Sequence, residues 1–222
     1  MRDTRTFNTL RYQESALNFG DHIRINKLVG FIGSNKKVLD LGCLDGTIGL
    51  MIMKNDNDVY GVDASETAVQ NAIKKGVKAR VGDLEKPLDY PDENFDAVCA
   101  GEIIEHIYDI DLFLDDIHRV LKAEGILALS TPNLASFGRR LLLLFNRNPH
   151  IEISYSGQAA GHIRYFVRGT LETILQKHKF VIVQFTTDVI NFNSSGSLNS
   201  VKLAQIFSSL GRSLIIKAKK RG

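Results

Sequence analysis

The segment Gly101–Ile107, GEIIEHI, places two carboxylates and an imidazole within one turn of chain: Glu102, Glu105 and His106. If this segment is helical, residues at spacings of three and four project from one face. Carboxylates and imidazoles transfer protons in acid–base catalysis, and both bind divalent ions. The trio therefore predicts either a catalytic or metal-binding face, or the polar side of a surface helix, depending on where the fold places it.

Short apolar segments that end in glycine or polar residues alternate with amphipathic segments along residues 36–133. Apolar runs of this length favour strands, and apolar residues spaced by three and four favour helices. The alternation predicts an α/β fold with a parallel, doubly wound sheet. Strands are expected at 36–43, 58–65, 77–83, 94–102 and 126–133, and helices at 47–55, 65–76 (Ser65 as N-cap, Gly76 as stop) and 109–125.

The alternation changes after Asn133. Helices are expected at 134–145, 167–179 and 201–211, strands at 180–188 and 212–220, and a long polar loop at 146–165. Loops of this length inside a compact domain are usually functional. We expect a single domain over 1–222, with residues 1–35 as an N-terminal helical cap over one edge of the sheet. Residues 134–170 are expected to form a helix and loop insertion on the substrate side.

The composition is that of an ordinary globular protein. Of 222 residues, 44% are hydrophobic and 24% charged, and the formal net charge is +3. Much of the basic excess lies in the C-terminal segment 217–222, KAKKRG, which we interpret as a solvated, frayed end. Cys43 and Cys99 lack the spacing of a zinc site and suit buried free thiols. Neither a signal core nor an apolar run long enough to span a membrane is present, so we expect a cytoplasmic protein.

The predicted strand ends carry the residues that a nucleotide-like cofactor needs. In open α/β sheets, ligands bind beyond the carboxyl ends of the strands. Gly42 and Gly46 in VLDLGCLDGTIG allow a turn to approach a ligand closely. Asp63 follows Gly42 by about 20 residues, the distance at which an acid meets a ribose diol. Asp83, at the next strand end, suits an exocyclic amine on a base.

Asp40 distinguishes two classes of cofactor. A dinucleotide turn has the pattern G-x-G-x-x-G, whereas here Gly42 and Gly46 stand four apart with Leu44 between them. The Asp40 carboxylate would repel a pyrophosphate but attract the ammonium of a methionine moiety. Charge therefore favours S-adenosylmethionine over NAD, and an NAD-dependent oxidoreductase is the weaker alternative.

These motifs give the chain a resemblance to the class I S-adenosylmethionine-dependent methyltransferases. The matching stretches are VLDLGCLDGTIG, VYGVDAS, VGDLEKPLDYPDENFDAVCAGEIIEHI and LKAEGILALSTPN, within residues 36–133. The resemblance implies a Rossmann-like sheet of seven strands, mostly parallel, with the last strand antiparallel. It also implies the cofactor-binding set Asp40, Gly42, Cys43 and Gly46 at the methionine part, Asp63 and Ala64 at the ribose, and Asp83 and Leu84 at the adenine. The sequence departs from the family at Leu44, where glycine is common.

The resemblance locates the opening trio beside the transferred methyl, where three interpretations remain open. In one, Glu102 lines the cofactor pocket, Glu105 is solvated and His106 bonds locally. In another, His106 is the catalytic general base, oriented by a carboxylate. In the third, the trio binds Mg²⁺ or Mn²⁺ that polarises an acceptor hydroxyl.

The third interpretation draws on a further resemblance. EIIEH is similar to the E-x-x-E-H turn of the ubiquinone-pathway O-methyltransferases and of the 2′-O-methyltransferases that act on small-RNA ends. In the RNA group a later histidine completes a metal site, which implies Glu102, Glu105, His106 and His162 as ligands here.

The acceptor is the least determined part. The segment 136–149, SFGRRLLLLFNRNP, is either a core-facing helix or an amphipathic surface, with a peripheral membrane contact through 138–145. It resembles segments of methyltransferases that act on polysaccharides and lipid-linked sugars. RNA is the less favoured acceptor because no basic stripe with interleaved aromatics is present. We therefore expect O-methylation of a small-molecule, lipid-linked or saccharide acceptor.

Overall fold

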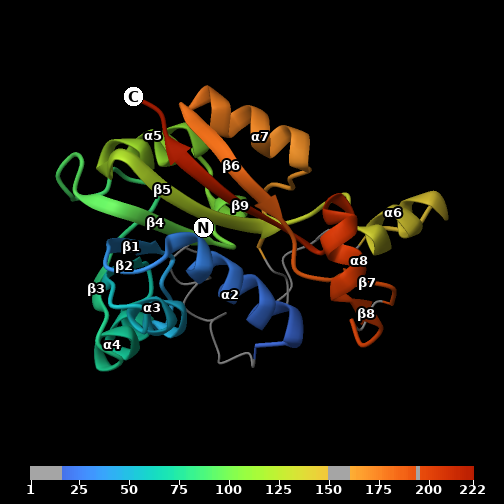
Figure 1. The fold of residues 1–222 in the computed structure, drawn as a ribbon, viewed down its shortest axis with the longest axis horizontal. Coiled ribbons are helices and arrows are strands. Elements are labelled where there is room, and N and C mark those ends of the chain that lie inside the picture. Colours follow the sequence, from blue (N-terminus) through green and yellow to red (C-terminus); the bar gives the residue numbers. More distant parts are fainter. Residues whose placement is uncertain (1–16, 150–160, 194–195) are drawn as a thin grey trace, which may run out of the picture.

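A seven-stranded sheet forms the centre of the fold. The structure is a computed structural model, and it describes residues 17–149, 161–193 and 196–222. The strands of this main sheet lie in the order β3-β2-β1-β4-β5-β9-β6 (Figure 1). β9 pairs antiparallel with both neighbours, and the other pairs of the main sheet are parallel. The predicted seven-stranded sheet with an antiparallel last strand is therefore confirmed. The bounds are β1 Lys37–Leu41, β2 Asp58–Asp63, β3 Lys78–Val81, β4 Phe95–Gly101, β5 Leu121–Pro132, β6 Phe180–Thr186 and β9 Ser213–Lys220.

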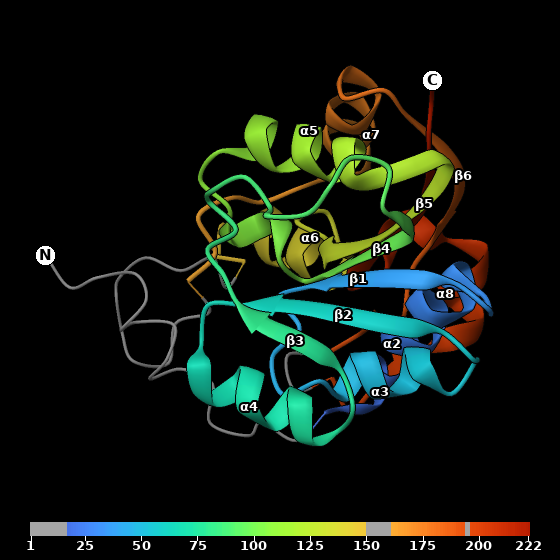
Figure 2. The same cartoon turned by 90° about the vertical axis from the view of Figure 1, so that its left-hand side faces the viewer.

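Helices cover both faces of this sheet, as Figures 1 and 2 show. One face carries α2 (Phe19–Ile32), α3 (Thr47–Met53) and α4 (Glu66–Lys74). The other carries α5 (Ile110–Val120) and α7 (Arg168–Lys177). Two buried apolar clusters, one under each helical layer, hold the three layers together. The pattern of β1, with four consecutive buried residues, is that of a strand covered on both faces.

Local signals in the sequence set several helix ends. The Ser65 hydroxyl accepts a hydrogen bond from the Ala68 N–H and caps α4, as expected. Gly76 has φ +93°, a left-handed conformation that ends a helix. Asp109 caps α5 in the same way, by accepting from the Leu112 N–H. These short-range contacts explain why the predicted starts of both helices are close to the observed ones.

The end of α5 differs from the sequence prediction. The helix was expected to continue to Gly125, but it stops at Val120 and the chain enters β5 at Leu121. Leu121 is fully buried and pairs with Phe95 of β4. The propensity of LKAE favours helix, but sheet pairing and burial of Leu121 override it.

Helix α2 covers a face of the sheet rather than the expected edge. It packs against β4, β5 and β9, near the middle of the sheet. Its buried residues include Arg24, Ile25, Leu28 and Ile32, which lie at helical spacing. The apolar stripe was correctly predicted, but the strand it covers depends on long-range packing.

The C-terminal segment is not the frayed end that its lysines suggested. Residues up to Lys220 belong to β9, which lies between β5 and β6. The Lys220 Nζ donates to the Leu121 carbonyl at 2.8 Å, and its alkyl stem is buried. Ladder hydrogen bonds on both sides order this segment despite its charge.

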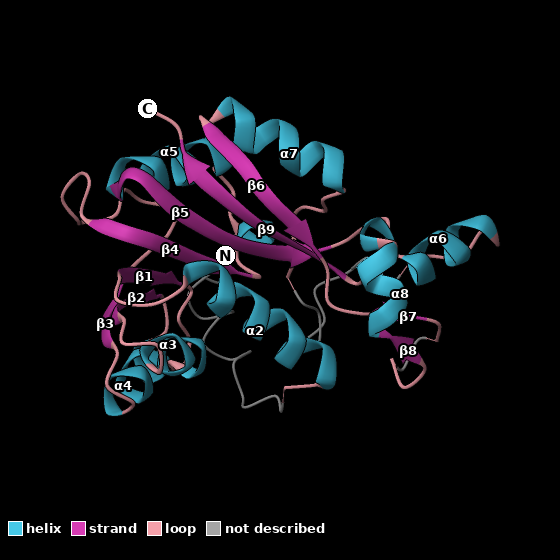
Figure 3. Cartoon of the chain, in the orientation of Figure 1, coloured by secondary structure: helices cyan, strands magenta, loops and turns pink. Residues whose placement is uncertain are grey.

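A smaller unit extends from the carboxyl end of β5. It comprises α6 (Phe137–Leu144), the two-stranded sheet of β7 (Ile190–Asn191) and β8 (Asn199–Ser200), and α8 (Val201–Ile206). Figure 3 shows these elements together, to one side of the main sheet. Two 3-10 turns, η1 (Ile104–His106) and η2 (Ser208–Leu210), complete the described elements. Among the described residues, no helix is both long and apolar enough to cross a membrane.

Gly46 offers a direct test of the turn after β1. It has φ +78°, and a Cβ there would lie 2.8 Å from the Ala72 backbone. We expect Gly46→Ala to lower the free energy of unfolding by about 2 kcal/mol, from backbone strain and this clash. Gly30→Ala is the matched control, because a Cβ there meets nothing within 4 Å. It should raise stability by ~0.5–1 kcal/mol. Urea denaturation of both variants measures this, and equal effects would contradict it.

Candidate functional site

The carboxyl ends of the parallel strands bring the predicted cofactor residues to one edge. The order β3-β2-β1-β4-β5 places Asp83, Asp63, the Gly42 turn, Glu102 and Thr131 along this edge in that sequence. Parallel register aligns these ends; Asp40, for example, pairs with Gly61 of β2 and with Cys99 of β4. Residues as far as 89 positions apart in the chain, Gly42 and Thr131, therefore share one edge.

The turn after β1 has the open backbone that a ligand cradle requires. Gly42 has φ +70°, and a Cβ there would lie 2.9 Å from Ile103. Leu44 also adopts a left-handed conformation, with φ +47°. For a non-glycine residue this conformation costs roughly 1–3 kcal/mol, so the surrounding contacts must hold it. Leu44 therefore adopts the left-handed backbone conformation that a glycine would adopt at this position, but at an energetic cost.

Asp63 is the contact that holds this turn. Its carboxylate accepts from the Leu44 N–H and from the Ser65 N–H, both at 2.9 Å. Burial raises the pKa of Asp63, while these backbone donors lower it. Each carboxylate oxygen has a second lone pair, so both can also accept from a diol. Asp63 therefore supports the turn and still has lone pairs that could accept from a ligand.

The other predicted cofactor residues differ in exposure. Asp83 is half-buried after β3 and accepts from the Glu85 N–H at 3.2 Å. Leu84 packs against a core cluster, and Ala64 is half-buried beside Asp63. Cys43 is buried, with its sulfur against Gly61, so only its backbone belongs to the turn. Cys43 and Cys99 are free and buried, as expected.

Asp40 is a buried carboxyl with an unused oxygen. It is 1% exposed, and its Oδ2 has no hydrogen-bond partner among the described residues. The Cys99 thiol bonds to this carboxyl, but burial dominates and raises the pKa of Asp40 to about 7. A cation bound nearby would satisfy the orphaned oxygen and favour ionisation.

The raised pKa of Asp40 predicts a pH dependence of stability. An unfolded Asp ionises near pH ~3.9. Between about pH 4 and pH 7 the native state keeps a proton that the unfolded chain has lost, so the free energy of unfolding falls as pH rises. Asp40→Asn should flatten this slope, whereas Asp89→Asn, at an exposed carboxyl, should leave it unchanged. Urea denaturation across this range tests it; identical slopes in both variants would contradict it.

Arg24 reaches the site from the cap helix and was missed by the sequence reasoning. Its Nη1 donates to the Ser130 Oγ at 3.2 Å, and its Nε lies 3.8 Å from a Glu102 oxygen. That Nε is buried without a hydrogen-bond partner among the described residues. The available signal was an arginine on the otherwise apolar, buried side of α2. A buried, incompletely paired guanidinium suits an anionic ligand group.

Glu102 lies beside Arg24 rather than on a helix with Glu105. It has φ +55° and precedes the short 3-10 turn η1, so the helical spacing assumed for the trio is wrong. Its carboxylate accepts from the Ser130 hydroxyl at 3.0 Å. Burial raises the pKa of Glu102, and the charge of Arg24 opposes this.

Glu105, His106 and His162 converge although the segment of Glu105 and His106 is a 3-10 turn and not an α-helix. One ligand-type atom from each lies within 4.8 Å of the others. Glu105 is 1% exposed; its Oε2 accepts from the Thr131 hydroxyl at 2.9 Å, and its Oε1 has no hydrogen-bond partner among the described residues. His162 Nε2 stands 3.9 Å from Glu105 Oε1. Burial, then the charge of Glu102, raises the pKa of Glu105 to about 8.

Backbone contacts bring His162 to this place. The N–H groups of Ile163 and Arg164 both donate to the Glu105 carbonyl, at 3.0 and 3.3 Å. The His106 Nδ1 lies 3.1 Å from the Gly161 carbonyl oxygen, which fixes that ring beside His162. The two imidazole centroids are 4.9 Å apart. The chain after the loop is thus fastened directly to the η1 turn.

Comparison with known proteins identifies the family and the fold of the chain. A family model described as a methyltransferase domain matches residues 32–180, about two thirds of the chain. The chain belongs to the class I S-adenosylmethionine-dependent methyltransferases. The methyltransferase of Thermotoga maritima, a solved structure, superposes with a TM-score of 0.67 and 19% identity over 98% of this chain and 94% of that one. The S-adenosylmethionine-dependent methyltransferase of Mesorhizobium loti superposes with a TM-score of 0.62 and 17% identity, over 88% of this chain and 95% of that one.

Curated relatives match this methyltransferase over a shorter region. The human mitochondrial ubiquinone biosynthesis O-methyltransferase is 30% identical over 119 residues, 50% of this chain and 32% of that protein. The ubiquinone biosynthesis O-methyltransferase of Pelagibacter ubique is 32% identical over 103 residues, which are 45% of this chain and 43% of that protein. The chain therefore spans less than half the length of these relatives.

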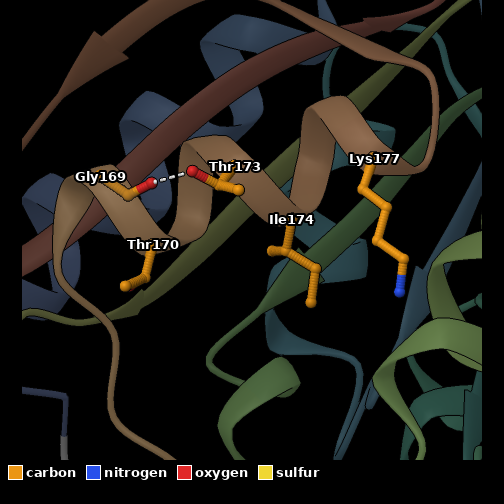
Figure 4. Close-up of a pocket in the computed structure, with 5 residues that line it drawn as sticks. All are labelled: Gly169, Thr170, Thr173, Ile174 and Lys177. Atoms are coloured by element: carbon orange, nitrogen blue, oxygen red, sulfur yellow. Dashed lines mark hydrogen bonds between the residues drawn. The ribbon is translucent and has the colours of Figure 1, made fainter.

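The cofactor of the family, S-adenosylmethionine, fits the residues of this edge. Its ammonium matches the orphaned, buried oxygen of Asp40, its carboxylate matches the unpaired Nε of Arg24, and its ribose matches Asp63. A depression of 390 Å³ elsewhere, along α7, is lined by Gly169, Thr170, Thr173, Ile174 and Lys177 and offers neither a carboxylate nor an arginine for this cofactor (Figure 4). The Lys177 that lines it is bonded to Asp111.

Proposed function

We propose that this methyltransferase transfers the methyl of S-adenosylmethionine to a hydroxyl of a small-molecule, lipid-linked or saccharide acceptor. The observation that carries the proposal is the convergence of Glu105, His106 and His162 beside the glycine turn. A hydroxyl needs its proton removed or its alkoxide stabilised, and this trio offers groups for either. The named O-methyltransferase relatives support oxygen as the acceptor atom.

The chain's own residues would bind and orient the reactants. S-adenosylmethionine, when bound, supplies an electrophilic methyl on a sulfonium. Asp40 and Arg24 would hold the two charged ends of its methionine part, and Asp63 the ribose hydroxyls. Asp83 and Leu84 are proposed for the adenine, at the next strand end. Such placement lowers the entropic barrier of an in-line displacement, which is the main contribution of an enzyme to this reaction.

A divalent metal is one of two proposed ways to activate the acceptor. The unpaired Oε1 of Glu105 and the imidazoles of His106 and His162 form a donor set of mixed oxygen and nitrogen, which suits Mn²⁺ better than Mg²⁺. Glu102 lies outside this group and faces Arg24. The other way is His106 as a general base, with Glu105 near its partner His162.

Calorimetry tests the cofactor and the metal separately. We expect S-adenosylhomocysteine to bind the wild-type protein, and absence of binding would overturn the proposed function. Mn²⁺ should bind wild type and bind His106→Ala at least about tenfold more weakly, because ligand loss costs no less than loss of an outer-shell partner. His118→Ala is the control, since that ring bonds to the Arg221 carbonyl, away from the trio. Equal Mn²⁺ affinity in both variants would exclude the metal site, and His106 as a general base would then be the remaining mechanism.

The acceptor side is proposed to include residues 134–170, which carry α6 and His162. A cavity of about 850 Å³ lies between α6 and β7 and contains both charged and apolar groups. Arg139 lines it; burial lowers the pKa of this arginine, and the charges of Tyr165 and then Glu102 oppose that shift. The Arg139 Nη1 also donates to the Asn133 carbonyl at 2.9 Å, just after the end of β5, so one wall of the cavity lies at the same sheet edge as the proposed methyl-transfer site. Part of the long loop, residues 150–160, lies outside the described residues.

A further inference from the structure

Half of the large hydrophobic side chains that are exposed among the described residues gather in one place. Leu144 is 76% exposed, Phe145 70% and Ile206 69%. No residue of α6 is buried. A monomeric protein rarely leaves a patch of this kind uncovered unless it binds something. We name this the α6–α8 face: Leu141, Leu143, Leu144, Phe145, Phe192, Leu198, Leu203, Ile206 and Phe207.

The elements that carry this face are in contact, so it is one surface. Helix α6 packs against β7, and α8 packs against β7 and η2. The rings of Phe137 and Phe192 meet edge to face with centroids 5.4 Å apart, which joins the start of α6 to the end of β7. Figure 1 shows α6, α8 and the small β7–β8 sheet on the same side of the molecule.

The two segments that form this face carry charge of one sign. The segments 134–149 and 189–222 contain no aspartate or glutamate. They contribute Arg140, Arg147 and Lys202, which are exposed, and Arg139, which lines the 850 Å³ cavity. Exposed leucine and phenylalanine next to basic residues form the combination that binds an anionic lipid surface.

We propose that the α6–α8 face docks on an anionic bilayer and brings the mouth of the acceptor cavity to that surface. A second copy is a poorer occupant, because a two-fold contact would bring together two copies of segments that carry basic residues and no aspartate or glutamate. Single-stranded RNA is also a poorer fit, because aliphatic side chains outnumber aromatic ones on this face. The role of the cavity rests on the proposed function, whereas docking itself does not.

Vesicle flotation of the full chain tests docking without any need for activity. We expect binding to phosphatidylcholine vesicles that contain about 30 mol% phosphatidylglycerol, weaker binding to pure phosphatidylcholine, and a decline with added salt. Leu144→Glu/Phe145→Glu should lower the partition constant at least about tenfold. Arg140→Glu/Lys202→Glu should remove the preference for anionic vesicles. Ile73→Glu, at a 45%-exposed position on α4, is the matched control and should bind as wild type does.

Several outcomes would overturn the proposal. These are absence of wild-type binding to either vesicle, equal binding by the face variants and Ile73→Glu, or stronger binding to a single-stranded oligoribonucleotide than to vesicles. A wild-type dimer that Leu144→Glu/Phe145→Glu dissociates, without vesicle binding, would assign the face to self-association. Circular dichroism melting shows that each variant is folded. Affinity for S-adenosylhomocysteine is measured in parallel, so failure of the cofactor assignment is separate from failure of docking.

Discussion

Glu105→Gln is expected to lower the rate of methyl transfer at least ~100-fold while affinity for S-adenosylhomocysteine changes little. The substitution removes the carboxylate that we propose either to bind a metal or to orient the imidazoles. It should not unfold the protein, because glutamine can still accept from Thr131 and because burial already favours the neutral form of Glu105. The assay is transfer of labelled methyl to the best acceptor from a panel of phenols, polyols and saccharides.

A matched control and a rescue experiment make this result interpretable. Glu124→Gln alters an exposed carboxylate that pairs with Lys219, so its rate should equal the wild-type rate. If Glu105→Gln and Glu124→Gln are equally active, the trio has no part in catalysis. His106→Ala then distinguishes the two mechanisms. Added imidazole should restore part of its activity if His106 is a base, whereas excess Mn²⁺ should do so if His106 is a ligand.

Asp63→Ala is expected to weaken S-adenosylhomocysteine binding by about 10- to 150-fold, the range for loss of hydrogen bonds to a charged group. It should also lower the free energy of unfolding by roughly 1–3 kcal/mol, because the N–H groups of Leu44 and Ser65 lose their acceptor. Asp63→Asn should also fail, since an amide presents only one acceptor oxygen to these two donors. Calorimetry measures the affinity and urea denaturation the stability.

Asp58→Ala is the control for this prediction because it lies at the other end of the same strand. Its carboxylate is exposed and pairs with Lys78, so neither affinity nor stability should change appreciably. Unaltered S-adenosylhomocysteine affinity in Asp63→Ala would show that this carboxylate does not touch the cofactor. A stability loss without an affinity loss would limit Asp63 to supporting the turn.

Motifs that act over a few residues were predicted well. The Ser65 cap and the Gly76 stop depend on neighbours within about one turn, and the structure shows both. The strands that contain Asp40 and Asp63 were correctly placed for the same reason, since buried parallel strands form continuous apolar runs. The predicted end of α5 was wrong because Leu121 pairs in the sheet with Phe95, a residue that is remote in the sequence.

The acceptor side shows the opposite case. The helical spacing proposed for the trio does not exist, since Glu102 is left-handed and precedes a 3-10 turn. Glu105, His106 and His162 nevertheless converge, through hydrogen bonds from Ile163 and Arg164 to the Glu105 carbonyl. Arg24 also lies at the site, beside Glu102, although the sequence predicted only a structural role for its helix, α2. None of these contacts leaves a periodic trace in the chain.

The sequence by itself determined the fold class, the family and the strand ends that carry Asp40, Asp63 and Asp83, because period, turn chemistry and motif are local properties. Only the tertiary structure decided which polar groups face one another. It left one oxygen of Asp40, one of Glu105 and the Nε of Arg24 buried without hydrogen-bond partners in the described part of the chain. It also gathered the exposed leucines and phenylalanines of α6, α8 and the residues that follow them on one face. These arrangements depend on packing between segments far apart in the chain, which no local pattern specifies.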